Sequence, residues 1–127
     1  MPDEISRNIS VDTLVAATDV GAVDDTWVDI GDVIDMRQAN RLIIYCDLVV
    51  NDSTGVFLRA LPVKTAAGTP YTALSTASDT WDLRSADASH WVQFIADMFP
   101  FIQLQSKATV VGATEGTLAI DITKVKV

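Results

Sequence analysis

The chain has few candidates for covalent catalysis: its only histidine, its only cysteine, and the serine next to the histidine. His90 is the only histidine, Ser89 precedes it, and Cys46 is the only cysteine. A serine or thiol nucleophile needs a base within hydrogen-bond reach, so every such relay would depend on His90. No GxSxG elbow is present, and Cys46 falls on the apolar face of an expected strand, where cysteine usually acts as a small inert hydrophobe. We therefore expect a surface or capping role for His90 and a protein that is not an enzyme.

A run of aspartates between residues 24 and 35 is a second group that could do chemistry. Calcium takes six to eight oxygen ligands, often from one loop. The spacing lacks the DxDxDG pattern with a distal glutamate, and aspartates around an Ile-Gly pair are typical of turns. Turn and capping roles are the main interpretation, and calcium binding is the alternative. The run consists of Asp24, Asp25, Asp29, Asp32 and Asp35.

Three tryptophans could bind a sugar or a protein, because flat exposed rings stack on sugars and anchor interfaces. Trp27 and Trp91 stand at expected strand starts, so we place them in the core. Trp81 lies in residues 65–90, a long excursion rich in Ala, Thr, Ser, Gly and Asp. Loops of this length are usually functional or form contacts. We expect Trp81 to be the most exposed of the three.

The segment at residues 97–101 places a methionine and two phenylalanines at an expected turn. Turns are normally solvated, so this much apolar surface predicts a contact patch. Met98 and Phe99 are its candidate residues. Packing of the segment onto the edge of its own fold is the alternative.

Composition narrows the class of protein and its partners. The chain has 127 residues, of which 49% are hydrophobic and 20% charged, which is typical of one globular domain. A single cysteine excludes an internal disulfide and a thiolate metal site. The net charge of −8 argues against nucleic-acid binding, and no apolar run is long enough to span a membrane. We expect no cofactor.

Period-two hydrophobic patterns predict strands along most of the chain. Both faces of residues 41–50 are apolar, which predicts a central strand covered on two sides. We expect it to form a hairpin with residues 56–64 across the turn-forming segment Asn51–Gly55. In residues 101–109 we expect the face that begins with Ile102 to be core and the face that begins with Phe101 to be solvated or in contact with a partner. Further expected strands are residues 9–16, 26–30, 80–83, 91–96 and 117–127.

The hydrophobic phase of the last expected strand reverses near its end. Leu118, Ile120 and Ile122 share one face, but the next apolar residues are Val125 and Val127. A reversal of this kind follows from a β-bulge near Thr123 or from burial of the opposite face by another subunit. Val125 and Val127 are therefore candidate subunit contacts. Fraying of the end is the alternative.

About eight short strands joined by Asp, Gly and Asn turns predict an all-β protein, a single-domain β-sandwich. The paired cysteines around a tryptophan that mark immunoglobulin domains are absent, so a jelly roll is favoured over an immunoglobulin-like sandwich. We expect the domain to span residues 9–127. Residues 1–8 have no strand pattern and are expected to form a flexible arm.

The order and spacing of these segments resemble a group of viral structural proteins. Residues 26–127 are similar to the small jelly-roll capsid cement or decoration proteins of tailed bacteriophages, a likeness of layout that involves no catalytic residues. It is carried by Trp27-Val28-Asp29-Ile30-Gly31, by Leu42-Ile43-Ile44-Tyr45-Cys46-Asp47-Leu48, by the Phe101–Gln105 strand and by Gly116-Thr117-Leu118-Ala119-Ile120-Asp121-Ile122.

The resemblance implies a virion structural protein that is made in the host cytoplasm and binds the outer surface of the assembled head. Its partners would be the major capsid protein and itself, as a homotrimer or homodimer. Ile5, in the arm, would then be a capsid or subunit contact. A tail or fibre component is the alternative within this class. A carbohydrate-binding host-adhesion module is the alternative from another class.

Overall fold

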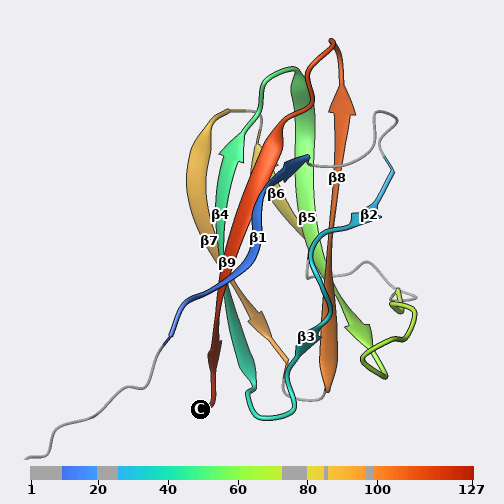
Figure 1. Cartoon of the computed structure of the whole chain (residues 1–127), viewed down its shortest axis with the longest axis vertical. Helices are drawn as coiled ribbons and strands as arrows, with labels where there is room; N and C mark the ends of the chain where they lie inside the picture. The colour runs from blue at the N-terminus through green and yellow to red at the C-terminus, as the bar shows by residue number, and fades with distance from the viewer. Residues whose placement is uncertain (1–9, 20–25, 73–79, 85, 97–98) are drawn as a thin grey trace, which may run out of the picture.

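Two antiparallel sheets packed face to face make up the fold in the computed structural model of the chain (Figure 1). The structure describes residues 10–19, 26–72, 80–84, 86–96 and 99–127, and within them it contains strands but no helix. No helix there could therefore cross a membrane. The strands are β1 (Asp12–Asp19), β2 (Val28–Asp29), β3 (Ile34–Asp35), β4 (Arg41–Val49), β5 (Ser53–Val63), β6 (Thr80–Arg84), β7 (Ala88–Ile95), β8 (Phe101–Val110) and β9 (Thr117–Val125).

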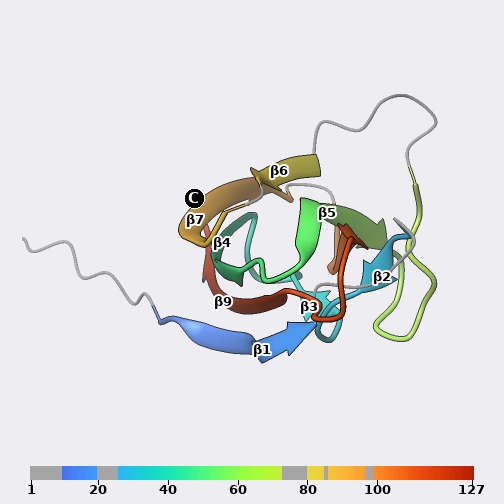
Figure 2. The same cartoon turned by 90° about the horizontal axis from the view of Figure 1, so that it is seen from above.

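The strand order is that of a jelly roll. Sheet A has the order β1-β9-β4-β7, and sheet B has the order β2-β8-β5-β6, with β3 also paired to β8. The chain passes from one sheet to the other at most connections, so its first and last strands become neighbours in sheet A. Figure 2 shows the two layers from above. The predicted all-β sandwich, and the preference for a jelly roll, are confirmed.

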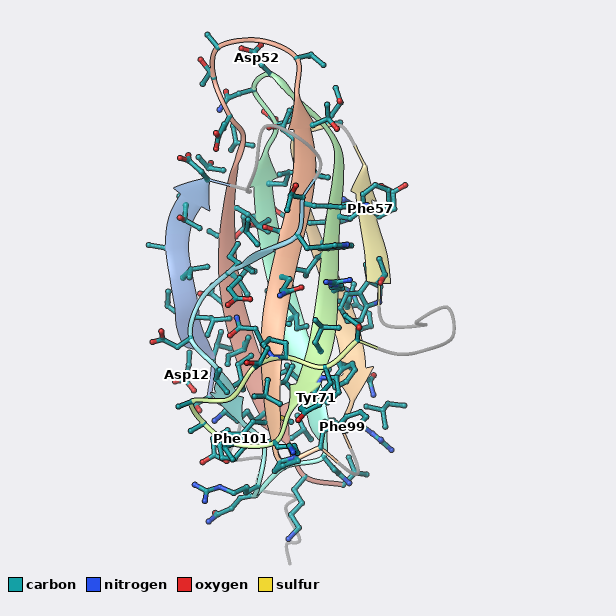
Figure 3. All side chains as sticks on the ribbon, turned by 90° about the vertical axis from the view of Figure 1, so that its right-hand side faces the viewer. Asp12, Asp52, Phe57, Tyr71, Phe99 and Phe101 are labelled. Atoms are coloured by element: carbon teal, nitrogen blue, oxygen red, sulfur yellow. The ribbon has the colours of Figure 1, made fainter. Side chains whose placement is uncertain are left out.

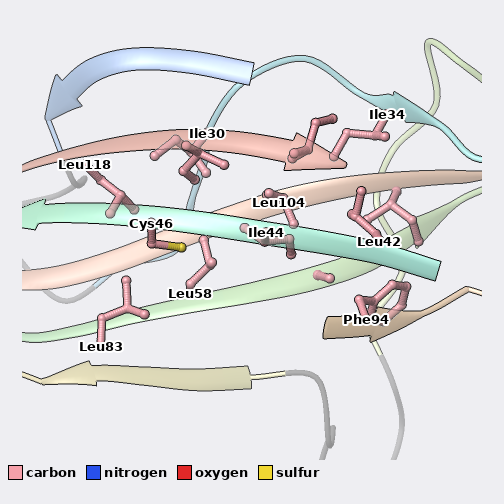
Figure 4. Close-up of a cluster of buried hydrophobic side chains, with 14 of the residues drawn as sticks. Ile30, Ile34, Leu42, Ile44, Cys46, Leu58, Leu83, Phe94, Leu104 and Leu118 are labelled. Carbon is pink, nitrogen blue, oxygen red and sulfur yellow. The ribbon is translucent and has the colours of Figure 1, made fainter. Parts of the chain in front are cut away.

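The core lies between the sheets and is made by alternate residues of each strand. Leu42 and Ile44 of β4 and Leu104 of β8 are buried and face the interior (Figure 4). Leu48 of β4 and Ile102 of β8 are buried in the same core. These residues follow the period of two that the sequence shows, because successive side chains of a strand point to opposite faces. The inward face predicted for residues 101–109 is confirmed. On the opposite face Phe101 and Gln103 are buried within the chain, so that face is not solvated at this end.

The predicted hairpin between residues 41–50 and 56–64 is wrong. The two segments do form consecutive strands, but β4 pairs with β7 and β9 while β5 pairs with β6 and β8. Asn51 and Gly55 adopt positive φ angles of 46° and 56°, as expected for a tight connection. The connection turns the chain from one sheet to the other, because both strands bury an apolar face and these faces meet across the core.

The expectation that β4 is covered on both sides is also wrong. Its inner face is buried, but Tyr45 and Val49 on its outer face are exposed. No described strand or loop of the chain packs over that face in the way that the loop at residues 64–72 folds back on sheet B, where Tyr71 N–H donates to Pro62 O. A two-layer sandwich buries one face of each sheet, and nothing obliges it to cover the second.

The end of the chain is held in place. β9 pairs with β4 in unbroken register from Thr117 to Val125, so this pairing has no bulge near Thr123. Val127 N–H donates to Asn40 Oδ1 over 2.9 Å, and Asn40 Nδ2 donates to Val127 O over 3.3 Å, which argues against fraying. The apolar phase of β9 ends at Lys124, which is exposed although its partner Leu42 on β4 is buried. Register shifts occur instead between β1 and β9.

The inward and outward faces of β4 provide a matched test of this core. Ile44→Ala should lower the free energy of unfolding by roughly 2–5 kcal/mol, because it leaves a cavity between the sheets. Ile43→Ala, on the outer face of the same strand, should cost clearly less, since Ile43 is only half-buried. Urea unfolding followed by circular dichroism measures both values. Equal losses would contradict the assignment of the two faces.

Candidate functional site

The outer face of sheet A carries the most exposed aromatic side chains of the described sheets. Trp91 on β7 stands directly opposite Tyr45 on β4, and their exposed fractions are 65% and 38%. Ile95, at the end of β7, is 55% exposed, and Val49, at the end of β4, is also exposed. Tyr45 and Trp91 form the aromatic centre of this face, and the polar residues Asp47, Ser89 and Gln93 separate them from Val49 and Ile95 at its two ends. Exposed aromatic side chains on a rigid sheet often mark a contact surface. We call the four exposed hydrophobic residues the Trp91 face.

A shallow, open hollow of about 540 Å³ lies on this face. Its rim is polar, since Ser89 Oγ donates to Asp47 Oδ1 over 2.6 Å, and Asp121 stands opposite Tyr45 on β9. The hollow therefore combines two aromatic rings with carboxylate acceptors, a combination that fits a protein partner or a sugar. It is lined by Val11, Tyr45, Cys46, Asp47, Ser89, His90, Trp91 and Asp121.

Cys46 and His90 are brought directly opposite each other across β4 and β7. Cys46 is buried, and this burial, assisted by the charge of Asp47, raises the pKa of its thiol from 9.0 to about 12. An activated thiol nucleophile needs a shift in the other direction. His90 lies within β7 rather than at its start; its Nε2 is buried and has no hydrogen-bond partner among the described residues. The position at the start of the strand expected for His90, and with it the capping role, is therefore wrong, and the side chain is half-buried beside the open hollow.

The high pKa of Cys46 predicts an inert thiol. At pH 8 a pKa near 12 leaves about a thousandfold less thiolate than the ordinary value of 9.0 does, and only the thiolate reacts. Alkylation of the native protein by iodoacetamide, followed by mass spectrometry, should therefore be slower by at least this factor than alkylation in urea. Rapid modification of the folded protein would contradict the buried position.

The other two tryptophans are positioned against the expectations from sequence. Trp81 is half-buried and packs against the core, whereas Trp91 is exposed. The expectation that Trp81 is the most exposed tryptophan is therefore wrong, and so is the expectation that Trp91 lies in the core. Trp27 is half-buried above the outer face of sheet B, where Arg59 and Lys107 approach its ring centroid to 4.2 and 5.1 Å. Arg59 also donates to Gln105 Oε1. These cations already contact the Trp27 ring that a sugar would need for stacking.

The aspartate run is distributed over separate contacts. Asp29 accepts a hydrogen bond from Gln105, and the bonds from Arg37 lower the pKa of Asp35 to about 2. Asp24 and Asp25 lie outside the described residues. Within those residues no three acidic, histidine or cysteine side chains gather as a metal site would require.

Basic residues gather at the end of the sandwich where β3 and β9 terminate. An open hollow of about 780 Å³ lies there, with Lys124 and Lys126 on its rim beside the Arg37–Asp35 ion pair, which is 2.7 Å long. These side chains are long and exposed, and the hollow contains no buried polar group that would hold a ligand. It is a charged surface rather than a built site.

The remaining candidate contacts that the structure describes lie near one end of the sandwich, around Asn40 and Ala96. Phe99 is half-buried, and its ring stacks on Phe94 with centroids 6.1 Å apart, so it packs onto its own sandwich. Val125 is half-buried beside Arg41, and Val127 is 80% exposed. Ile5, with the whole expected arm, and Met98 lie outside the described residues.

Sequence reasoning missed the residues that do form a common face. The signal was present, since Ile43, Tyr45 and Val49 give β4 a second apolar face. That pattern was assigned to burial on both sides, which is how continuous apolar strands usually behave. Trp91 alternates with inward-facing residues of β7, but its direction depends on where the strand begins, and β7 begins three residues before the expected start.

Comparison with known proteins gives a likeness of fold. The sequence matches no protein-family model and no curated protein. The structure is similar to the crystal structure of the SPBc2 prophage-derived protein YomS. The TM-score is 0.50 at 16% sequence identity, and the match covers 96% of this chain and 98% of that chain. At this identity the two proteins share an architecture along their whole lengths.

Proposed function

We propose that the chain is a non-enzymatic virion structural protein of a tailed bacteriophage. In this proposal it is a decoration protein that self-associates and binds the major capsid protein on the outer surface of the assembled head, which it stabilises. The protein would be made in the host cytoplasm. The proposal is supported by the jelly-roll fold, by its likeness to a prophage-derived protein of nearly equal length, and above all by the Trp91 face.

The Trp91 face is the observation that carries the proposal. A decoration protein acts by contact alone, so it needs a rigid frame and an apolar surface that becomes buried when it binds. Here Tyr45 and Trp91 stand on two adjacent strands held in continuous register over eight residue pairs, so their positions are fixed before binding. Aromatic side chains that are pre-positioned in this way lose little entropy on contact, and they dominate the energetics of many interfaces.

The charge of the protein favours binding to a finished surface. With a net charge of −8, the protein stays soluble and is repelled by nucleic acid, so it is suited to the outside of a filled head. The acidic residues around the Trp91 face, Asp47 and Asp121, would limit nonspecific association and favour a partner surface that supplies hydrogen-bond donors or cations.

The two tyrosines of the chain allow a matched test of the proposal. Tyr45→Ala should weaken binding to purified heads of the encoding phage by at least about tenfold, as is typical for the loss of a central aromatic contact. Tyr71→Ala removes a ring that is even more exposed, on the side of sheet B (Figure 3), and should leave binding unchanged. Co-sedimentation with heads measures both. If the wild-type protein does not sediment with heads, the decoration role is wrong.

A carbohydrate-binding host-adhesion module is the second candidate, favoured by the aromatic pair and carboxylates of the same hollow. Sugar stacking on Trp91 should shift its fluorescence when a panel of short neutral oligosaccharides is titrated, and Trp91→Ala should abolish the shift. Trp27→Phe, at a ring already covered by cations, serves as the control and should preserve it. A panel without any shift would exclude this candidate for neutral sugars.

A further inference from the structure

The edges of the two sheets differ in how well they are protected against pairing with another strand. β1 has two register shifts against β9, β6 has one against β5, and β2 is only two residues long. Short strands, irregular pairing and charged side chains all discourage an edge from adding a further strand. β7 has none of these features. It is eight residues long and pairs with β4 without a shift, and among the described strands β4 is its only neighbour.

β7 also differs from the other strands in charge. Its sequence is Ala-Ser-His-Trp-Val-Gln-Phe-Ile, and it is the only one of the nine described strands without an Asp, Glu, Lys or Arg residue. In a chain with a net charge of −8, two copies repel each other wherever acidic surfaces meet. A neutral strand at an edge is the place where two copies can approach with less of this cost than at the other strands.

The backbone of β7 is oriented for such pairing. Ala96 N–H, just beyond the strand, donates to Asn40 O over 2.9 Å, so its backbone groups point towards β4. In an antiparallel ladder this direction alternates along the strand, and the even-numbered residues of β7 therefore bond to β4. The N–H and C=O groups that point to the free edge belong to Ser89, Trp91, Gln93 and Ile95.

We propose that β7 pairs with β7 of a second copy of this chain, antiparallel and across a two-fold axis. The inference deepens the self-association in the proposed function and rests on it. Full overlap of the outward-pointing residues places Ser89 opposite Ile95 of the partner subunit and Trp91 opposite Gln93 of the partner subunit. About eight backbone hydrogen bonds would form. The two copies of sheet A become one continuous sheet, and the two Trp91 faces become one surface.

A proline at the free edge tests the pairing. Gln93→Pro removes an N–H that points away from β4, so the fold is expected to tolerate it, while the ring blocks the approach of a second strand. Gln93→Ala keeps the N–H and serves as the matched control. Light scattering after size-exclusion chromatography should give twice 13.7 kDa for the wild type and for Gln93→Ala, and 13.7 kDa for Gln93→Pro. A monomeric wild type, or a dimeric proline variant, would overturn the proposal.

Charge substitutions test the register even if the proline variant fails to fold. Trp91→Glu with Gln93→Glu places carboxylates opposite each other twice in the dimer, whereas Trp91→Lys with Gln93→Glu places opposite charges there. Both positions are exposed in the monomer, so the variants should be similarly stable. The dissociation constants of the two dimers should differ by roughly tenfold or more. Equal constants would overturn the proposed register.

Binding to heads is a separate readout, so the two proposals fail in different ways. A dimer through β7 that does not sediment with heads leaves the pairing intact and removes the decoration role. A wild-type monomer that sediments with heads overturns the β7 pairing and leaves the decoration role intact.

Discussion

Burial of one face of sheet A against one face of sheet B is the interaction on which the rest of this structure depends. Leu42, Ile44 and Leu48 meet Ile102 and Leu104 across the core, and every connection between the sheets follows from bringing these faces together. The contact also explains the turn after β4. Hydrogen bonding between β4 and β5 would place them in one sheet, whereas facing each other across the core lets both bury their apolar sides.

The same constraint leaves a surface open. A sandwich of two layers has two outer faces, and loops cover much of the outer face of sheet B, where Leu61 and Gln103 are buried. Sheet A keeps Tyr45 and Trp91 exposed, beside an edge strand without charge. Apolar surface and neutral backbone therefore occur at one place on a strongly acidic molecule. That coincidence links the proposed decoration role to the proposed pairing of subunits.

Several polar and titratable side chains of the described residues are engaged in contacts within the fold. Gln105 links Arg59 to Asp29 across neighbouring strands, and Asp35 is bound by Arg37. Cys46 is held as a protonated thiol inside the core, because burial disfavours the thiolate. The outer face of sheet A, by contrast, presents exposed aromatic side chains beside the edge strand β7.

The sequence by itself determined the fold class, because an alternation with period two is a local property that any strand must express. It located β8 and β9 and assigned their inward faces correctly: Ile102 and Leu104 on β8, and Leu118 and Ile120 on β9. Only the tertiary structure decided which strands are neighbours and which second faces are covered. Pairing joins residues far apart in the chain, such as Tyr45 with Trp91 and Asp121. The exposure of Trp91 therefore depends on packing that no local pattern records.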